Sequence, residues 1–157
     1  MKKKLLAALA VSALLLTGCG DKKVSEATDN LPTVTANQGE APTIGAPKGN
    51  PPTTLVTKDI IVGTGAEALP TSTMTVHYTL MTWSNGKLIE SSWTGGTPAT
   101  FPLANVIVGW QKGIPGMKVG GRRLLVIPPD LGYGSQGGGP IGPNETLIFV
   151  VDAIGVA

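Results

Sequence analysis

Short apolar runs separated by turn residues dominate the second half of the chain. Five such runs are enriched in Val, Ile, Leu and Thr and are bounded by Gly, Pro or Asn, a pattern typical of β-strands. They cover residues 54–62, 74–83, 87–92, 122–127 and 146–153. Asn85-Gly86 separates the second run from the third and is a sequence typical of a tight hairpin turn. The pattern predicts an antiparallel sheet.

One further segment has helical periodicity. In residues 106–114, Val106, Ile107, Trp110 and Ile114 follow one another at spacings of one, three and four, which gathers their side chains on one face of a helix. A proline follows immediately and would end the helix. The expected fold class is therefore α+β, an antiparallel sheet of about five strands curled over one short α-helix.

The start of the chain has a different pattern. Lys2, Lys3 and Lys4 precede residues 5–16, in which Ser12 is the sole polar residue. This apolar run is too short to span a bilayer and has the length of a signal-peptide core. It leads into Leu-Thr-Gly-Cys at residues 16–19, which resembles the lipobox of bacterial lipoproteins.

The lipobox resemblance implies a signal peptide over residues 1–18 and a lipid, such as palmitate, on Cys19. An anchor of two or more acyl chains holds a protein stably on a membrane. The expected localisation is the extracytoplasmic face of a bacterial cell membrane, at the cell surface or in the periplasm. The alternative is a free or buried cysteine that happens to follow a leader.

Residues 19–53 are predicted to be the lipidated cysteine and a disordered linker. The segment after Cys19 contains no aromatic residue, is rich in Pro, Gly and Thr, and has no apolar period of 2 or 3.6, so it should not bury enough surface to fold. All seven aromatic residues lie between Tyr78 and Phe149. The folded domain is therefore expected over residues 54–157, a length that can fold alone.

Charge and composition exclude several functions. The chain has 12 Lys and Arg and 10 Asp and Glu, and three of the lysines belong to the leader. The remainder has no excess of positive charge with which to bind a nucleic-acid backbone. A single cysteine cannot form an intramolecular disulfide, and with a single histidine it makes a Cys/His zinc site implausible. No metal or cofactor is expected.

Three local patterns have a chemical interpretation that the context disfavours. Gly63-Thr64-Gly65 begins a match to the dinucleotide fingerprint, but Pro70 leaves no room for the helix that this motif must open, and a tight turn fits better. The glycines of residues 132–139 lack the G-K-[ST] of a phosphate loop. His77 could serve a hydrolase serine, yet no G-x-S-x-G elbow exists, so His77 is expected to be an ordinary strand residue.

Apolar side chains are the remaining candidates for a functional site. A helix packed across the sheet would gather them around one cavity, or they are simply core residues, and composition leaves both interpretations open. The set is Tyr78, Ile89, Val106, Ile107, Trp110, Tyr133, Ile141 and Phe149.

Six local motifs resemble, in order and spacing, the FKBP-type peptidyl-prolyl cis-trans isomerases. They begin at residues 76, 86, 106, 113, 127 and 146 and read VHYT, GKLIESS, VIVGW, GIPGMKVG, IPPDLGYG and TLIFVV. The resemblance spans nearly all of residues 54–157 and implies a rotamase on a twisted antiparallel sheet. It implies no cofactor, a monomer, and X–Pro segments of exported or unfolded polypeptides as partners, with macrolide inhibitors as further candidate ligands.

Carried over residue by residue, the resemblance makes Trp110 the floor of a proline pocket. The Ile107 backbone N–H and the Tyr133 hydroxyl would bind substrate carbonyls, while Glu90 would contact the twisted carbonyl or orient Tyr78. The implied catalytic residues are Tyr78, Glu90, Ile107, Trp110, Tyr133 and Phe149, and the implied substrate-binding residues are Ile89, Val106 and Ile141.

The sequence departs from well-known family members around this pocket. Ile89 stands where an aromatic wall is usual, Glu90 replaces an Asp, and Ala99 stands where a Phe is expected. The Gly-rich loop over residues 135–143 is one residue short. We therefore expect a wider and less aromatic pocket.

The leading hypothesis is a membrane-tethered prolyl isomerase that assists the folding of exported proteins. The rival is a non-catalytic binding module, or holdase, that grips a proline segment or an unfolded chain, and a third is a structural surface lipoprotein. Loss of isomerisation in Trp110→Ala with the fold intact would favour catalysis, whereas holdase activity that survives the substitution would favour the rival.

Overall fold

The computed structural model describes residues 30–157. The predicted signal peptide and Cys19 lie outside the described residues. In chain order the elements are β1 (Val56–Ile61), β2 (Thr73–Thr82), β3 (Leu88–Ser91), β4 (Ala99–Pro102), the 3₁₀ helix η1 (Leu103–Asn105), α1 (Val108–Gly113), β5 (Arg122–Ile127), the 3₁₀ helix η2 (Pro129–Leu131) and β6 (Leu147–Val156).

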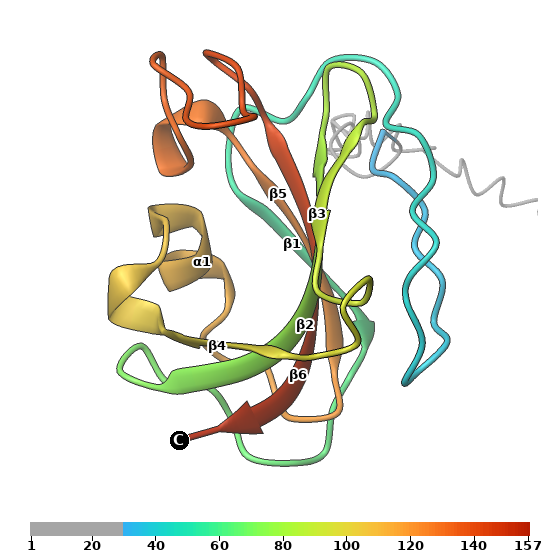
Figure 1. Cartoon of the computed structure of the whole chain (residues 1–157), viewed down its shortest axis with the longest axis vertical. Helices are drawn as coiled ribbons and strands as arrows, with labels where there is room; N and C mark the ends of the chain where they lie inside the picture. Colours follow the sequence, from blue (N-terminus) through green and yellow to red (C-terminus); the bar gives the residue numbers. More distant parts are fainter. Residues whose placement is uncertain (1–29) are drawn as a thin grey trace, which may run out of the picture.

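The strands form one bent antiparallel sheet. Its order is β1-β5-β6-β2-β3. Strand β4 pairs with the first half of β2, and β3 pairs with the second half. Helix α1 lies against the concave face of this sheet (Figure 1). The predicted α+β architecture is confirmed, with six strands instead of about five, because β4 was not predicted.

Helix α1 is shorter than the predicted segment 106–114. Val106 and Ile107 have extended backbones, with ψ of 172° and 150°, and the helix begins after them. Gly109 and Gly113 face β5, where a Cβ on either would collide with Ile127 or Leu125. Their lack of side chains allows the helix to approach the sheet closely.

Alternation along the central strands divides the apolar side chains between two cores. In β5, Leu125 and Ile127 point to the concave face, where they pack with α1, while Leu124 and Val126 point to the outer face. All four are completely buried. The sheet is therefore covered on both of its faces.

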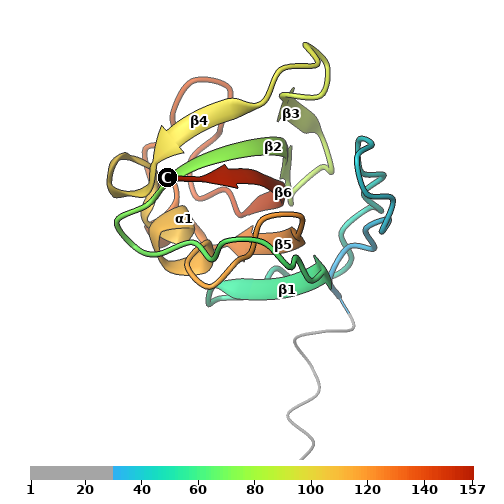
Figure 2. The ribbon, with the colours of Figure 1, turned by 90° about the horizontal axis from the view of Figure 1, so that it is seen from below.

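Residues 30–53, which we call the strap, form the cover of the outer face (Figures 1 and 2). A bridge between Val34 and Ile44 folds the strap into a hairpin, and Leu31, Val34 and Ile44 pack on the outer core around Trp83. The Trp83 Nε1–H donates to the Gly49 carbonyl over 3.1 Å. The prediction of disorder is thus wrong for residues 30–53.

A buried arginine fastens the strap to the sheet. Arg122 is 0% exposed, and its guanidinium donates to the carbonyl oxygens of Thr35 and Glu40 at 2.8 and 2.6 Å and to Asn37 Oδ1 at 3.0 Å. Its Nε donates to Asp152 Oδ1 at 2.7 Å. Burial raises the pKa of the Asp152 carboxyl, an effect that the Arg122 charge opposes.

Within residues 30–157, no helix is both long and apolar enough to cross a membrane.

Candidate functional site

A cavity of about 390 Å³ opens between α1 and the concave face of the sheet. Strands β2, β3, β4 and β6 supply its walls, the segment before α1 supplies its rim, and Trp110 of α1 reaches into it. The lining residues are Tyr78, Leu80, Glu90, Phe101, Asn105, Val106, Ile107, Trp110, Tyr133 and Phe149.

The indole of Trp110 is the centre of an aromatic box. The rings of Tyr78, Phe101 and Phe149 stand nearly perpendicular to it, at interplanar angles of 84°, 87° and 82° and centroid distances of 5.8, 5.7 and 5.3 Å. Edge-to-face contacts of this kind are favourable and fix ring orientations. The box provides a rigid apolar surface of the size that suits a small ring.

The segment that precedes α1 presents backbone groups at the rim. The Ile107 carbonyl accepts hydrogen bonds from the N–H groups of Trp110 and Gln111, whereas the Ile107 N–H precedes the helix and has no intrahelical acceptor. Gln111 Nε2 donates to the Val106 carbonyl at 2.8 Å. This bond holds the Val106-Ile107 backbone in its extended form beside the cavity.

The Tyr78 hydroxyl lies in a desolvated environment next to a carboxylate. Burial, followed by the nearby Glu90 carboxylate, raises the pKa of Tyr78 above its ordinary value. Tyr78 is therefore a neutral phenol at physiological pH. Tyr133, the second tyrosine at the cavity, is 41% exposed and reaches it from the solvent side.

Seven of the nine sequence-predicted site residues line the cavity, and two do not. Ile141 is buried in the concave core, and Ile89 is half-buried against it. Ile89 lies in a β-bulge, because Leu80 pairs with Glu90 and Met81 pairs with Leu88, which leaves Ile89 unpaired.

Three residues of the lining were not predicted, namely Leu80, Phe101 and Asn105. Leu80 could have been found, since it lies two residues after Tyr78 on one strand and so shares its face. Phe101 lies two residues after Ala99 on β4 and adds a further aromatic ring, edge-to-face with Trp110, to the lining formed by Tyr78, Trp110, Tyr133 and Phe149.

His77 and Ser92 do meet, on the outer face of the sheet. His77 Nδ1 lies 2.9 Å from Ser92 Oγ, which also accepts the Tyr78 backbone N–H at 2.9 Å. The imidazole stacks on Trp93 at a centroid distance of 3.9 Å. Because the ring is covered by Trp93 and 8% exposed, the pair joins β2 to the end of β3 and is not a hydrolytic site.

The loop after β1 is a turn, as expected. Gly65 N–H donates to the Val119 carbonyl at 3.0 Å, and Glu67 forms a bridge with Lys118. No helix starts at Gly63, so the dinucleotide interpretation fails.

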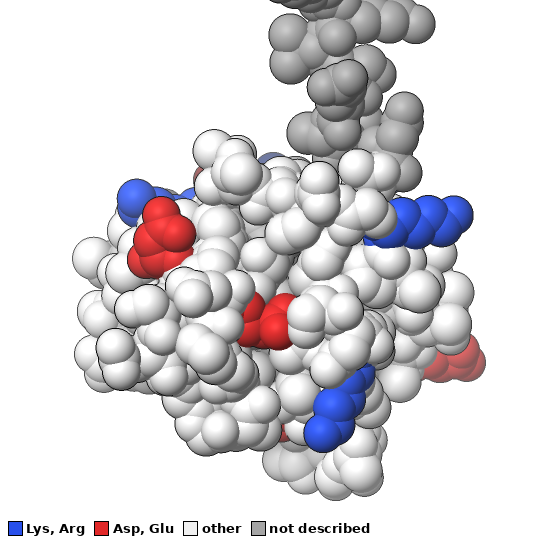
Figure 3. Space-filling model, turned by 90° about the horizontal axis from the view of Figure 1, so that it is seen from above, with Lys and Arg blue, Asp and Glu red and all other residues white. Residues whose placement is uncertain are grey.

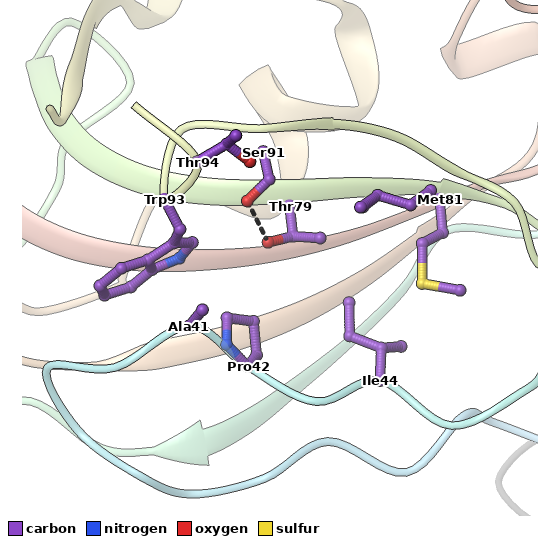
Figure 4. A pocket seen from close by; sticks show the side chains of 9 residues that line it. Ala41, Pro42, Ile44, Thr79, Met81, Ser91, Trp93 and Thr94 are labelled. Atoms are coloured by element: carbon purple, nitrogen blue, oxygen red, sulfur yellow. Dashed lines mark hydrogen bonds between the residues drawn. The ribbon is translucent and has the colours of Figure 1, made fainter. Parts of the chain in front are cut away.

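A second cavity, of about 420 Å³, lies on the outer face between the strap and the β2–β3 hairpin (Figure 4). Pro42 and Ile44 line one side, and Met81 and Trp93 line the other. Its lining contains no ionisable group, and Thr79 and Ser91 hydrogen-bond to each other there. We therefore assign the chemistry to the concave cavity.

Charged side chains are sparse and scattered, as the face seen in Figure 3 illustrates. Among residues 30–157, His, Cys, Asp and Glu form no group of three or more that could hold a metal ion.

The fold and the cavity together define a class of protein in which a small antiparallel sheet and one short helix enclose an aromatic pocket with polar groups at its rim. The family model for FKBP-type peptidyl-prolyl cis-trans isomerases matches residues 65–154, and the chain belongs to this family of enzymes.

Known relatives share this domain. A probable FK506-binding protein of Corynebacterium glutamicum is 50% identical over 115 residues, which cover 73% of this chain and 98% of the relative. The outer membrane protein MIP of Legionella longbeachae is 43% identical over 106 residues, or 67% of this chain and 45% of the relative. The crystal structure of FkpA from Escherichia coli superposes with a TM-score of 0.62 at 39% identity and covers 65% of this chain and 47% of that one.

Proposed function

We propose that this protein is a membrane-anchored prolyl isomerase that accelerates X–Pro rotation in exported polypeptides. The observation that carries the proposal is the aromatic box around Trp110 in a domain of this family. The box suits the pyrrolidine ring, because it offers apolar surface on several sides and no charged group on its floor.

The reaction needs no nucleophile. Amide resonance gives the X–Pro bond a rotation barrier of about 18–20 kcal/mol, and uncatalysed exchange takes tens to hundreds of seconds. Resonance separates charge, which water favours, so transfer of the prolyl bond into an apolar cavity destabilises the planar form relative to the twisted one. Interactions made only with the twisted form then accelerate rotation.

Each rim group has a defined part in this proposal. Trp110 supports the proline ring, with Val106 and Phe149 beside it. The Ile107 N–H and the Tyr133 hydroxyl donate hydrogen bonds to substrate carbonyls. Glu90 lies beside the Tyr78 hydroxyl, and its part is either a polar contact near the twisted carbonyl or the orientation of the phenol.

Membrane attachment through Cys19 is the second part of the proposal. The leader and lipobox support it, and the relative named as an outer membrane protein is consistent with a place in the cell envelope. Ten residues, 20–29, separate Cys19 from the strap. Because an extended chain spans about 3.3–3.6 Å per residue, the anchor would hold the domain close to the bilayer.

Anchoring is tested by labelling cells with a palmitate analogue. We expect the full chain to take up label and to partition with membranes, and Cys19→Ser to do neither. An unlabelled parent chain found outside the membrane fraction would refute the anchor and leave the enzymatic proposal untouched.

Isomerisation is tested by magnetisation-transfer NMR of short X–Pro peptides with the full chain. We expect acceleration by the parent chain and its loss in Trp110→Leu, checked for folding by circular dichroism. Trp93→Leu is the matched control, because Trp93 lies on the outer face, and it should retain activity. A folded parent chain that leaves every peptide unchanged would refute catalysis and favour the binding-module alternative.

A further inference from the structure

Glu90 is the one residue with a formally charged side chain among the residues that line the concave cavity. It lies on β3 opposite Leu80 and is exposed at the rim. The other ionisable groups of the lining are the phenols of Tyr78 and Tyr133. No lysine, arginine or histidine contributes to this wall.

The charge of Glu90 has no cationic partner within residues 30–157. The salt bridges of this part of the chain join Arg122 to Asp152 and Arg123 to Asp59, both away from the cavity. Lys87, three residues earlier in the β2–β3 turn, does not line the cavity. The neighbouring Tyr78 hydroxyl is an uncharged group and offers no positive charge to pair with Glu90.

The electric field of an unpaired carboxylate beside apolar walls extends farther than that of a carboxylate on an open surface. Low-dielectric material on the far side of the cavity weakens solvent screening and focuses the field into the opening. A substrate held with its proline against Trp110 would place its neighbouring side chains at this rim.

We propose that Glu90 selects the clients of this protein by charge, favouring X–Pro segments with a basic side chain next to the proline over those with an acidic one. The inference rests on the proposed function and specifies its substrate class. Because Glu90 is exposed, the effect should be modest, about three- to ten-fold in kcat/KM between Lys and Glu peptides at low salt.

The test compares capped peptides in two series, with Lys, Leu or Glu placed immediately before or immediately after the proline. Exchange rates are measured with the full parent chain, with Glu90→Gln and with Glu90→Lys. Glu67→Gln is the matched control for net charge, since Glu67 is exposed and lies outside the cavity lining. The readout is the ratio of kcat/KM for the Lys peptide to that for the Glu peptide.

We expect this ratio to exceed about three in at least one series for the parent chain and Glu67→Gln, to approach one in Glu90→Gln, and to invert in Glu90→Lys. It should also shrink with added salt in the parent chain. A role of Glu90 confined to orienting Tyr78 would change all peptides alike and leave the ratio unmoved.

A ratio near one in both series, or one that Glu90→Gln does not change, overturns the inference while acceleration of the Leu peptides preserves the proposed function. Absence of acceleration for every peptide, Leu included, overturns both.

Discussion

Arg122 Nε donates to Asp152 Oδ1 over 2.7 Å on the outer face of the sheet, and the arginine side chain is 0% exposed. The same guanidinium binds two carbonyl oxygens of the strap, from Thr35 and Glu40. One residue thus neutralises a buried carboxylate on β6 and satisfies backbone acceptors of a segment that is more than 80 positions away.

Replacement of this arginine should destabilise the domain severely. Arg122→Ala leaves Asp152 buried without its counter-charge, and loss of one partner of a buried pair costs about 3–5 kcal/mol. Urea unfolding measures the free energy of unfolding. Asp59→Asn is the matched control, because Asp59 pairs with Arg123 at a site where its side chain is 40% exposed, so the loss there should be at most about 1 kcal/mol. Equal losses in both variants would contradict the role assigned to Arg122.

Deletion of the strap should have a related effect. A chain reduced to residues 54–157 exposes the outer core around Trp83 and removes three of the acceptors of Arg122. We expect a loss of at least about 3 kcal/mol in the free energy of unfolding and a red shift of tryptophan fluorescence. Thermal and urea denaturation of the two chains check this. If the shorter chain is as stable as the full chain, the strap is not part of the cooperative fold.

The strap shows where sequence reasoning failed. Its many prolines and lack of aromatic residues are typical of a linker. It is attached by three scattered apolar side chains and by backbone carbonyls that accept hydrogen bonds from Arg122 and Trp83, and neither kind of contact produces a periodic pattern in the sequence. An indirect signal existed elsewhere. Residues 124–127 and 147–151 are unbroken apolar runs, which are typical of strands buried on both faces, so a cover for the outer face could have been inferred.

The concave side was far more predictable. The strand and helix patterns located β2, β5, β6 and α1 to within a few residues. Tyr78 and Phe149 were named as apolar candidates on two of these strands, and the family resemblance gave them their place in the pocket. Phe101 was missed because β4 is four residues long and lies among prolines. Ile89 was named through the family resemblance, and the bulge that leaves it unpaired beside the concave core cannot be read from alternation.

Gly109 should control the position of Trp110. A Cβ at Gly109 would lie 2.7 Å from Ile127 Cδ1 on β5, so Gly109→Ala must push α1 away from the sheet. Overpacking of this kind costs about 1–3 kcal/mol, and the displaced indole should also lower isomerisation of Leu–Pro peptides. Gly95→Ala, with no atom within 4 Å of the new Cβ, should change neither stability nor activity. Unaltered activity in Gly109→Ala would show that the pocket tolerates movement of the helix.

The environment of Tyr78 predicts a specific response to alkaline pH. Burial and Glu90 raise the pKa of Tyr78 in the folded chain above the ordinary value of 10.0. The unfolded chain therefore releases this proton at lower pH than the folded chain, so the stability that Tyr78 contributes is fully present below pH 10.0 and is lost as the pH rises from there toward the folded-state pKa.

Tyrosinate absorbance measures this pKa directly, because the chain contains two tyrosines. In Tyr133→Phe, where Tyr78 is the sole tyrosine, we expect a titration midpoint above 10.0 while the domain stays folded. Glu90→Gln should lower that midpoint, since it removes the carboxylate that disfavours the phenolate. The midpoint should remain above 10.0 even then, because burial is the larger cause. A midpoint at or below 10.0 in Tyr133→Phe would mean that the Tyr78 hydroxyl is solvated, and the buried phenol assigned to the pocket would have to be abandoned.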